Sequence, residues 1–140
     1  MTPLDRVTER VTRRGHPDSP GVPRPLLTID EFFEGNDVVG SIGCNLSGAP
    51  LPARFHELFK EIAKRTDVKD IRVQITMFDD PAWPFSDTVF IMTSASSDVV
   101  ETWFPDALRP DDMGVGFPEG TAYEPYETPP GMKAVLCWWD

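Results

Sequence analysis

The sequence predicts an α+β fold of the ferredoxin-like type, in which a four-stranded antiparallel sheet carries two helices on one face. From residue 38 onward the period of the apolar residues changes in the order strand, helix, strand, strand, helix, strand. This βαββαβ order is typical of ferredoxin-like sandwiches. The chain has 140 residues, a length that suits one domain with its own core.

The first 25 residues are expected to form an arm outside this domain, which would then span residues 26–140. The arm mixes arginine, proline and glycine, and a short helix over residues 5–14 would end at Gly15 and Pro17. We expect the arm to be flexible unless another surface pins it.

A short extra helix is expected before the first strand of the sheet. Thr28 and Glu31 have the spacing of a capping box, in which each side chain binds the backbone N–H of the other residue. Residues 38–46 then supply the weakest strand of the pattern, because Gly40 and Gly43 lower the β propensity and suggest a bulge.

The remaining elements have clearer periods. Residues 52–65 carry apolar side chains at i, i+3, i+4 and i+7 and predict an amphipathic helix. Residues 71–77 alternate and predict a half-buried strand, whereas residues 88–93 are apolar on both faces and predict a central strand. Ser97 is expected to cap the second main helix, and residues 134–139 to form the last strand.

Two loops interrupt this pattern. Residues 79–86 predict a long hairpin loop, and residues 109–132 contain five prolines and four glycines without any period. A loop as long as the second usually binds a partner, forms a lid or is disordered. The sheet face opposite the helices carries large apolar groups, so we expect the arm and this loop, or a partner such as a second copy, to cover it.

The charge of the chain is −10 and is unevenly placed, since residues 73–140 hold twelve acids against Arg109 and Lys133. Such a surface repels phosphate backbones, so nucleic-acid binding is not expected. It favours a basic protein partner, although acidic surfaces also simply keep proteins soluble. No apolar run approaches about 18 residues and no signal peptide is visible, so we expect a cytoplasmic chain without membrane contact and with reduced thiols.

Few residues indicate chemistry. Cys44 and His56 are the weak candidates for a catalytic nucleophile and base, but we expect an exposed histidine and a buried structural cysteine. Cys44 and Cys137 would lie on neighbouring strands of the predicted fold. There they could form a disulfide or share a metal ion, but we favour the interpretation that both are buried and pack as small apolar side chains.

The acidic residues of the hairpin offer a second weak site. Asp79, Asp80 and Asp87 match no calcium-loop spacing and are read as turn residues. No metal or cofactor is therefore expected.

Aromatic and acidic side chains of the loops and of the last strand are the expected partner-binding residues, since aromatic residues are enriched at interface anchors. They are Trp83, Phe85, Asp111, Asp112, Phe117, Glu119, Tyr123, Tyr126 and Trp138. The alternative is that the rings fasten the loops to the sheet.

Four stretches of the sequence, residues 30–36, 41–46, 83–87 and 138–140, resemble those of a family of small acidic bacterial proteins without an assigned activity. The resemblance covers roughly residues 26–140. It implies no substrate and no catalytic residue.

The leading hypothesis is a protein-binding module that neutralises or regulates a basic partner, as an immunity protein does for a toxin. One alternative is a small enzyme or ligand-binding domain with a pocket under residues 109–132, lined by Trp138, Phe117 and Tyr123 and using Cys44 or His56. Another alternative is a homodimeric structural module joined through the open sheet face.

Overall fold

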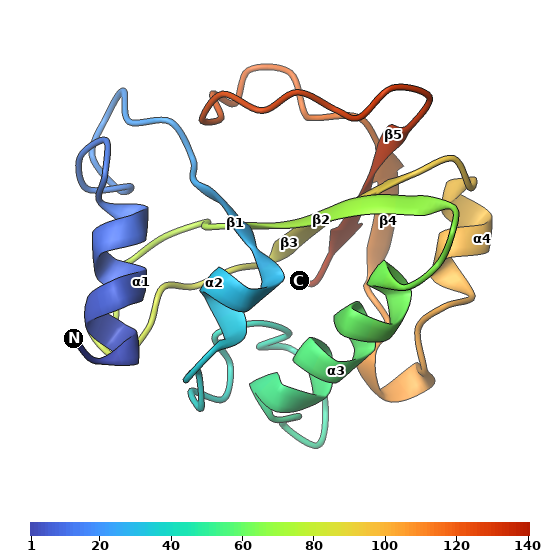
Figure 1. Ribbon diagram of the computed structural model, residues 1–140. Coiled ribbons are helices and arrows are strands. Elements are labelled where there is room, and N and C mark those ends of the chain that lie inside the picture. The colour runs from blue at the N-terminus through green and yellow to red at the C-terminus, as the bar shows by residue number, and fades with distance from the viewer.

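The computed structural model describes residues 1–140 and contains one antiparallel sheet of five strands in the order β1-β2-β3-β5-β4. The strands are β1 (Leu26–Thr28), β2 (Val68–Gln74), β3 (Thr88–Thr93), β4 (Asp112–Val115) and β5 (Lys133–Trp138). The helices are α1 (Pro3–Val11), α2 (Ile29–Phe33), α3 (Pro52–Ala63) and α4 (Ser97–Glu101), with a 3-10 turn, η1, over Asp106–Leu108. Figure 1 shows α2 and α3 on one side of the sheet and residues 116–132 on the other.

The α+β class is confirmed, but the four-stranded ferredoxin-like arrangement is not. That arrangement would take its first strand from residues 38–46 and place it inside the sheet. In the structure this segment is irregular, and β1 and β4, which the sequence pattern did not predict, form the two edges. The expected central strand is confirmed, because β3 lies in the middle of the sheet and is buried along its whole length.

The predicted strand over residues 38–46 is wrong because the backbone reverses direction there. Gly40 and Gly43 have φ values of 89° and 63°, which side-chain-bearing residues rarely adopt. A Cβ on Gly43 would lie 2.7 Å from Cζ of Phe55, so the loop also packs tightly on α3. The glycines that suggested a bulged strand therefore serve tight turns and a close approach.

The main core lies between the sheet and the helices. The capping box of Thr28 and Glu31 is confirmed and starts α2, which buries its two phenylalanines. The first helix, α1, adds Val7 and Val11 to the same core. Part of the N-terminal segment that we expected to be flexible unless pinned is thus packed against the domain.

The second sheet face is covered by the chain's own C-terminal loop. Phe117, Tyr123 and Tyr126 pack against a small apolar cluster on this face, and the ring centroids of Phe117 and Phe90 are 4.4 Å apart. The hydroxyl of Tyr123 donates to Gln74 at 3.0 Å, and the hydroxyl of Tyr126 donates to a β2 carboxylate at 2.7 Å. The sequence left open whether the chain's own loop or a partner covers this face, and in the structure the loop covers it.

The expectation that residues 109–132 lack secondary structure is wrong for residues 112–115, which form β4. This strand pairs with β5 through its backbone and includes Gly114. Its pairing does not require a repeating apolar pattern, so the sequence carried no period to reveal it.

Phe117→Ala tests whether the loop is an integral cover of the sheet. We expect the free energy of unfolding to fall by about 2 kcal/mol, because a half-buried ring leaves a cavity over Phe90. Urea unfolding measures the change. Glu119→Ala, at an exposed position of the same loop, is the matched control, and equal stability of both variants would contradict the role of the ring.

Candidate functional site

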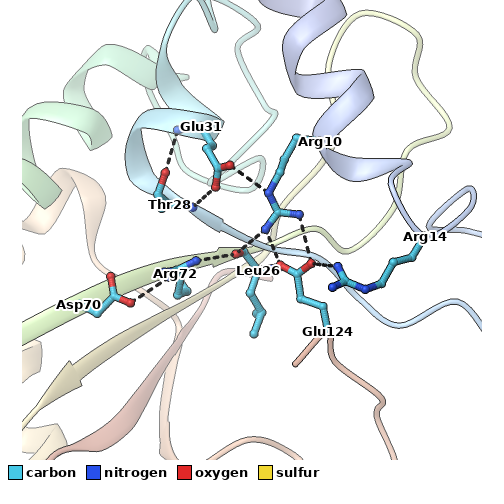
Figure 2. A network of polar contacts seen from close by, with 8 residues as sticks. All are labelled: Arg10, Arg14, Leu26, Thr28, Glu31, Asp70, Arg72 and Glu124. Carbon is cyan, nitrogen blue, oxygen red and sulfur yellow. Dashed lines mark hydrogen bonds and ion pairs between the residues drawn. The ribbon is translucent and has the colours of Figure 1, made fainter. Parts of the chain in front are cut away.

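A partly buried polar network joins distant parts of the chain at the β1 edge (Figure 2). Arg10 donates to both carboxylate oxygens of Glu124, which lies 114 residues away and is buried. Arg14 donates to Glu124 at 2.8 Å, and the Arg10 Nε donates to Glu31 at 3.0 Å. The backbone N–H of Leu26 also donates to Glu124, at 2.7 Å.

The charges in this network are mutually satisfied. Burial acts to raise the pKa of Glu124, but hydrogen bonds from Arg10 and from Leu26 outweigh it, and the pKa lies below its ordinary value. Burial would lower the pKa of Arg10, but the bonds to Glu124 and Glu31 raise it instead. With every charged group paired, we interpret the network as a structural tie between α1, β1 and the C-terminal loop.

A different surface has the character of a binding site. A hollow of about 400 Å³ lies where the loop after α2 meets the hairpin loop between β2 and β3. We call it the groove, and it is lined by residues 38–41, Met77, Asp79, Asp80, Trp83 and Phe85. Five of its nine lining residues are apolar, against two of ten in the hollow beside α1, so the groove is better suited to an apolar anchor.

Two apolar side chains of the groove remain in solvent. Val39 is 46% exposed and Met77 is 39% exposed, and both line the groove. Asp79 and Asp80 stand on the rim, and neither forms an ion pair within the chain. The groove thus combines apolar walls with uncompensated negative charge.

The walls of the groove are fixed by hydrogen bonds. The indole N–H of Trp83 donates to the carbonyl of Phe32 at 3.1 Å, and Ser86 N–H donates to the carbonyl of Ser41 at 2.8 Å. Asp18 accepts from the backbone N–H of Phe78, which fastens the other side of the hairpin loop. A preformed hollow of this kind loses little conformational entropy when it is filled.

The expected aromatic anchors divide into two groups. Trp83 and Phe85 lie in the groove, where Trp83 is buried and Phe85 is half-buried. Phe117, Tyr123 and Tyr126 instead pack on the second sheet face, as the alternative interpretation predicted. The structure therefore places only the first group at a hollow with exposed apolar side chains.

The acidic residues expected to bind a partner also differ in role. Asp111 accepts hydrogen bonds from Asn45 at 2.6 Å and from the N–H of Asp140 at 2.8 Å, so it ties the C-terminus to a loop. Asp112 and Glu119 are exposed, and Trp138 on β5 is half-buried.

No hydrogen bond joins the two catalytic candidates, Cys44 and His56, and each has other partners. Cys44 is exposed in a loop rather than on a strand next to Cys137, which is buried and whose thiol pKa is raised by that burial. His56 was expected on the solvent side of its helix, but its side chain is only 14% exposed. Its ring stacks on Phe33 and its Nε2 lies 3.1 Å from Asp30.

The remaining acidic candidate, Asp87, accepts hydrogen bonds from the hydroxyls of Thr76 and Thr88. Nowhere in the structure do three or more histidine, cysteine, aspartate or glutamate side chains gather in a way that could hold a metal ion. None of the helices has the length and apolar character needed to cross a membrane.

Sequence reasoning missed the residues that make the groove distinctive. Val39 was assigned to a strand, and Met77 to a half-buried strand that in fact ends at Gln74. The partnership of Arg10 with Glu124 was also missed, since no local pattern links residues so far apart.

Comparison with known proteins gives the family. A family model described as "Uncharacterized protein YfbO family" matches residues 2–137. The chain belongs to the YfbO family. A curated relative from Escherichia coli (strain K12), "Uncharacterized protein YfbO", is 43% identical over 140 residues and is covered in full, as is this chain. No solved structure matches.

The resemblance seen in four short stretches is thus confirmed, and the YfbO match extends it. The family model starts at residue 2 and includes α1, whereas the resemblance began at residue 26. Membership of the YfbO family transfers no reaction or partner to this chain.

Glu124→Gln tests the structural role of the polar network. We expect a loss of about 2 kcal/mol in the free energy of unfolding at pH 7, because Arg10 keeps Glu31 but loses its main counterion. Urea unfolding of the variant and of Glu119→Gln, an exposed control, measures it. An equal stability of the two variants would show that the network contributes little.

The same variant has a pH signature. The pKa of Glu124 is lower in the folded chain than its ordinary value of about 4.3, so the unfolded chain takes up the proton first as the pH falls. The stability from this residue is therefore present above about pH 4.3 and is lost below it. Glu124→Gln should have a shallower acid limb in its stability profile, and an unchanged limb would assign acid unfolding to other groups.

Proposed function

We propose that the chain is a cytoplasmic protein-binding module that docks an apolar anchor of a basic partner in the groove and thereby neutralises or regulates that partner. The single observation that carries the proposal is the groove itself, with two exposed apolar side chains on its walls and two unpaired aspartates on its rim.

The apolar exposure supports docking of a protein. Single exposed apolar residues are ordinary on a surface. Val39 and Met77, however, come from separate loops and line the same hollow, together with the half-buried ring of Phe85. Covering them would remove apolar area from water around a preformed cavity, which is the arrangement of an interface anchor site.

The charge supports a basic partner. Asp79 and Asp80 can pair with a lysine or arginine that flanks the apolar anchor, and neither has to give up an existing ion pair. The net charge of −10 attracts the same partner over longer distances. Neutral and acidic proteins gain nothing from this field, which makes it a source of selectivity.

The double variant Val39→Ser/Met77→Ser tests the apolar walls of the groove. We expect affinity for a purified partner, first captured from the native host with the wild-type chain, to fall by about tenfold to a hundredfold as apolar burial is lost. Val99→Ser is the matched control, since Val99 is 44% exposed on α4 outside the groove. A partner that binds the double variant and the wild type equally would exclude the groove.

The double variant Asp79→Asn/Asp80→Asn tests the negative charge on the rim of the groove. Asparagine keeps the shape and, at position 80, the oxygen that accepts from the N–H of Ala82. We expect association at low salt to slow several-fold and its salt dependence to weaken, while dissociation changes less. Biolayer interferometry at two salt concentrations measures this, and unchanged association kinetics would contradict the electrostatic part of the proposal.

A further inference from the structure

The outer edge of β4 presents backbone groups that have no partner. Gly116 N–H donates to the carbonyl of Ala134, and this register fixes which pairs of the β4–β5 ladder are hydrogen-bonded. The N–H and carbonyl groups of Met113 and Val115 therefore point away from β5. The Met113 N–H is occupied by the carboxylate of Asp112 at 2.9 Å, but no loop or side-chain hydrogen bond reaches the N–H of Val115.

The opposite edge of the sheet is closed by side chains. On β1, the outward N–H of Leu26 donates to Glu124 and that of Thr28 donates to Glu31. The carbonyl of Leu26 accepts from both Arg10 and Arg72 (Figure 2). The chain thus blocks one edge against strand addition and leaves the other edge free.

The surroundings of β4 select the kind of strand that fits. Met113 and Val115 project to one face of the sheet, and Val115 is 61% exposed, whereas Asp112 projects to the other face. From Asp98 to Glu119 the chain carries six acids and one base, Arg109, which already pairs with Asp106. An added strand that alternates apolar with basic side chains complements both faces.

We propose that β4 receives an extended segment of a basic protein partner as a sixth strand, with the Val115 N–H as a donor and the outward carbonyls of Met113 and Val115 as acceptors. This is strand addition, in which main-chain hydrogen bonds supply affinity and alternating pockets supply specificity. A second copy of the chain is the less favoured occupant, because pairing two β4 edges would bring together two acidic chains.

The inference rests on the proposed function only for the charge of the partner, since β4 and the groove share no residue. A basic partner can use either surface alone, so each surface needs its own variant.

Val115→Pro is the decisive variant. Proline removes the N–H and blocks the edge, yet it is tolerated on an edge strand where that N–H faces solvent. Val115→Thr keeps the N–H and the β-branched shape, and it is the matched control. The probe is a capped heptapeptide of alternating lysine and valine, titrated into the full chain by calorimetry and by amide NMR, with a glutamate–valine heptapeptide as the charge control.

We expect the lysine–valine peptide to bind wild type and Val115→Thr alike, and Val115→Pro about tenfold more weakly, as for the loss of one main-chain hydrogen bond. Binding should slow hydrogen exchange of the Val115 amide, and the glutamate–valine peptide should not bind. Equal binding to Val115→Pro, or no shift at Val115, would overturn the inference. Shifts confined to Val39 and Met77 would overturn it and leave the groove proposal standing.

Sedimentation of the chain without peptide tests whether a second copy of the chain occupies the β4 edge. A dimer in wild type that becomes a monomer in Val115→Pro would assign the edge to a second copy and overturn the basic-partner inference. A monomer in both, together with peptide binding at Val115, would support it.

Discussion

The arrangement of the molecule depends on the buried ion pair between Arg10 and Glu124. Arg10 comes from the first helix and Glu124 from the loop before the last strand, and both also bind the backbone of Leu26 on β1. Breaking either side would leave a charge in a poorly solvated place, which costs far more than an exposed pair. The first helix and the loop that carries Glu124 are therefore both held at the β1 edge of the sheet, and both are needed to close it.

Closing that edge decides which surfaces remain for binding. The helices cover one sheet face, and the loop with Phe117, Tyr123 and Tyr126 covers the other, so neither face is free for a partner. Among the large apolar side chains exposed to solvent, Val39 and Met77 line the groove and Val115 lies on β4, whereas Met1, Leu51 and Val99 lie elsewhere. Because the groove is held by hydrogen bonds to Phe32 and Ser41, it is a fixed feature rather than a product of binding.

The sequence predicted the elements whose packing repeats along the chain. The stripe of α3, the doubly buried β3, the capping box of Thr28 and the closing strand are local patterns, and the structure contains each of them. The two edge strands were not predicted, for two reasons. Strand β1 has only three residues, and β4 is held in the sheet by backbone pairing that needs no apolar period. Among the residues of the groove, Trp83 and Phe85 were predicted to bind a partner. The place of Val39 could not be predicted without knowing that the chain turns at Gly40 and Gly43.

The uneven distribution of charge along the chain can be explained from the structures of the two sheet edges. Glu31 and Glu124 near β1 pair with Arg10 of α1 and with Arg14, which follows that helix. By contrast, Asp79, Asp80 and Asp112 have no basic partner within the chain. A surface that only served solubility would gain nothing from placing uncompensated acids beside exposed Val39 and Met77, or on the same short strand as exposed Val115. Apolar groups next to unpaired acids resemble one half of an interface whose other half is basic, and the groove and the β4 edge both have that composition.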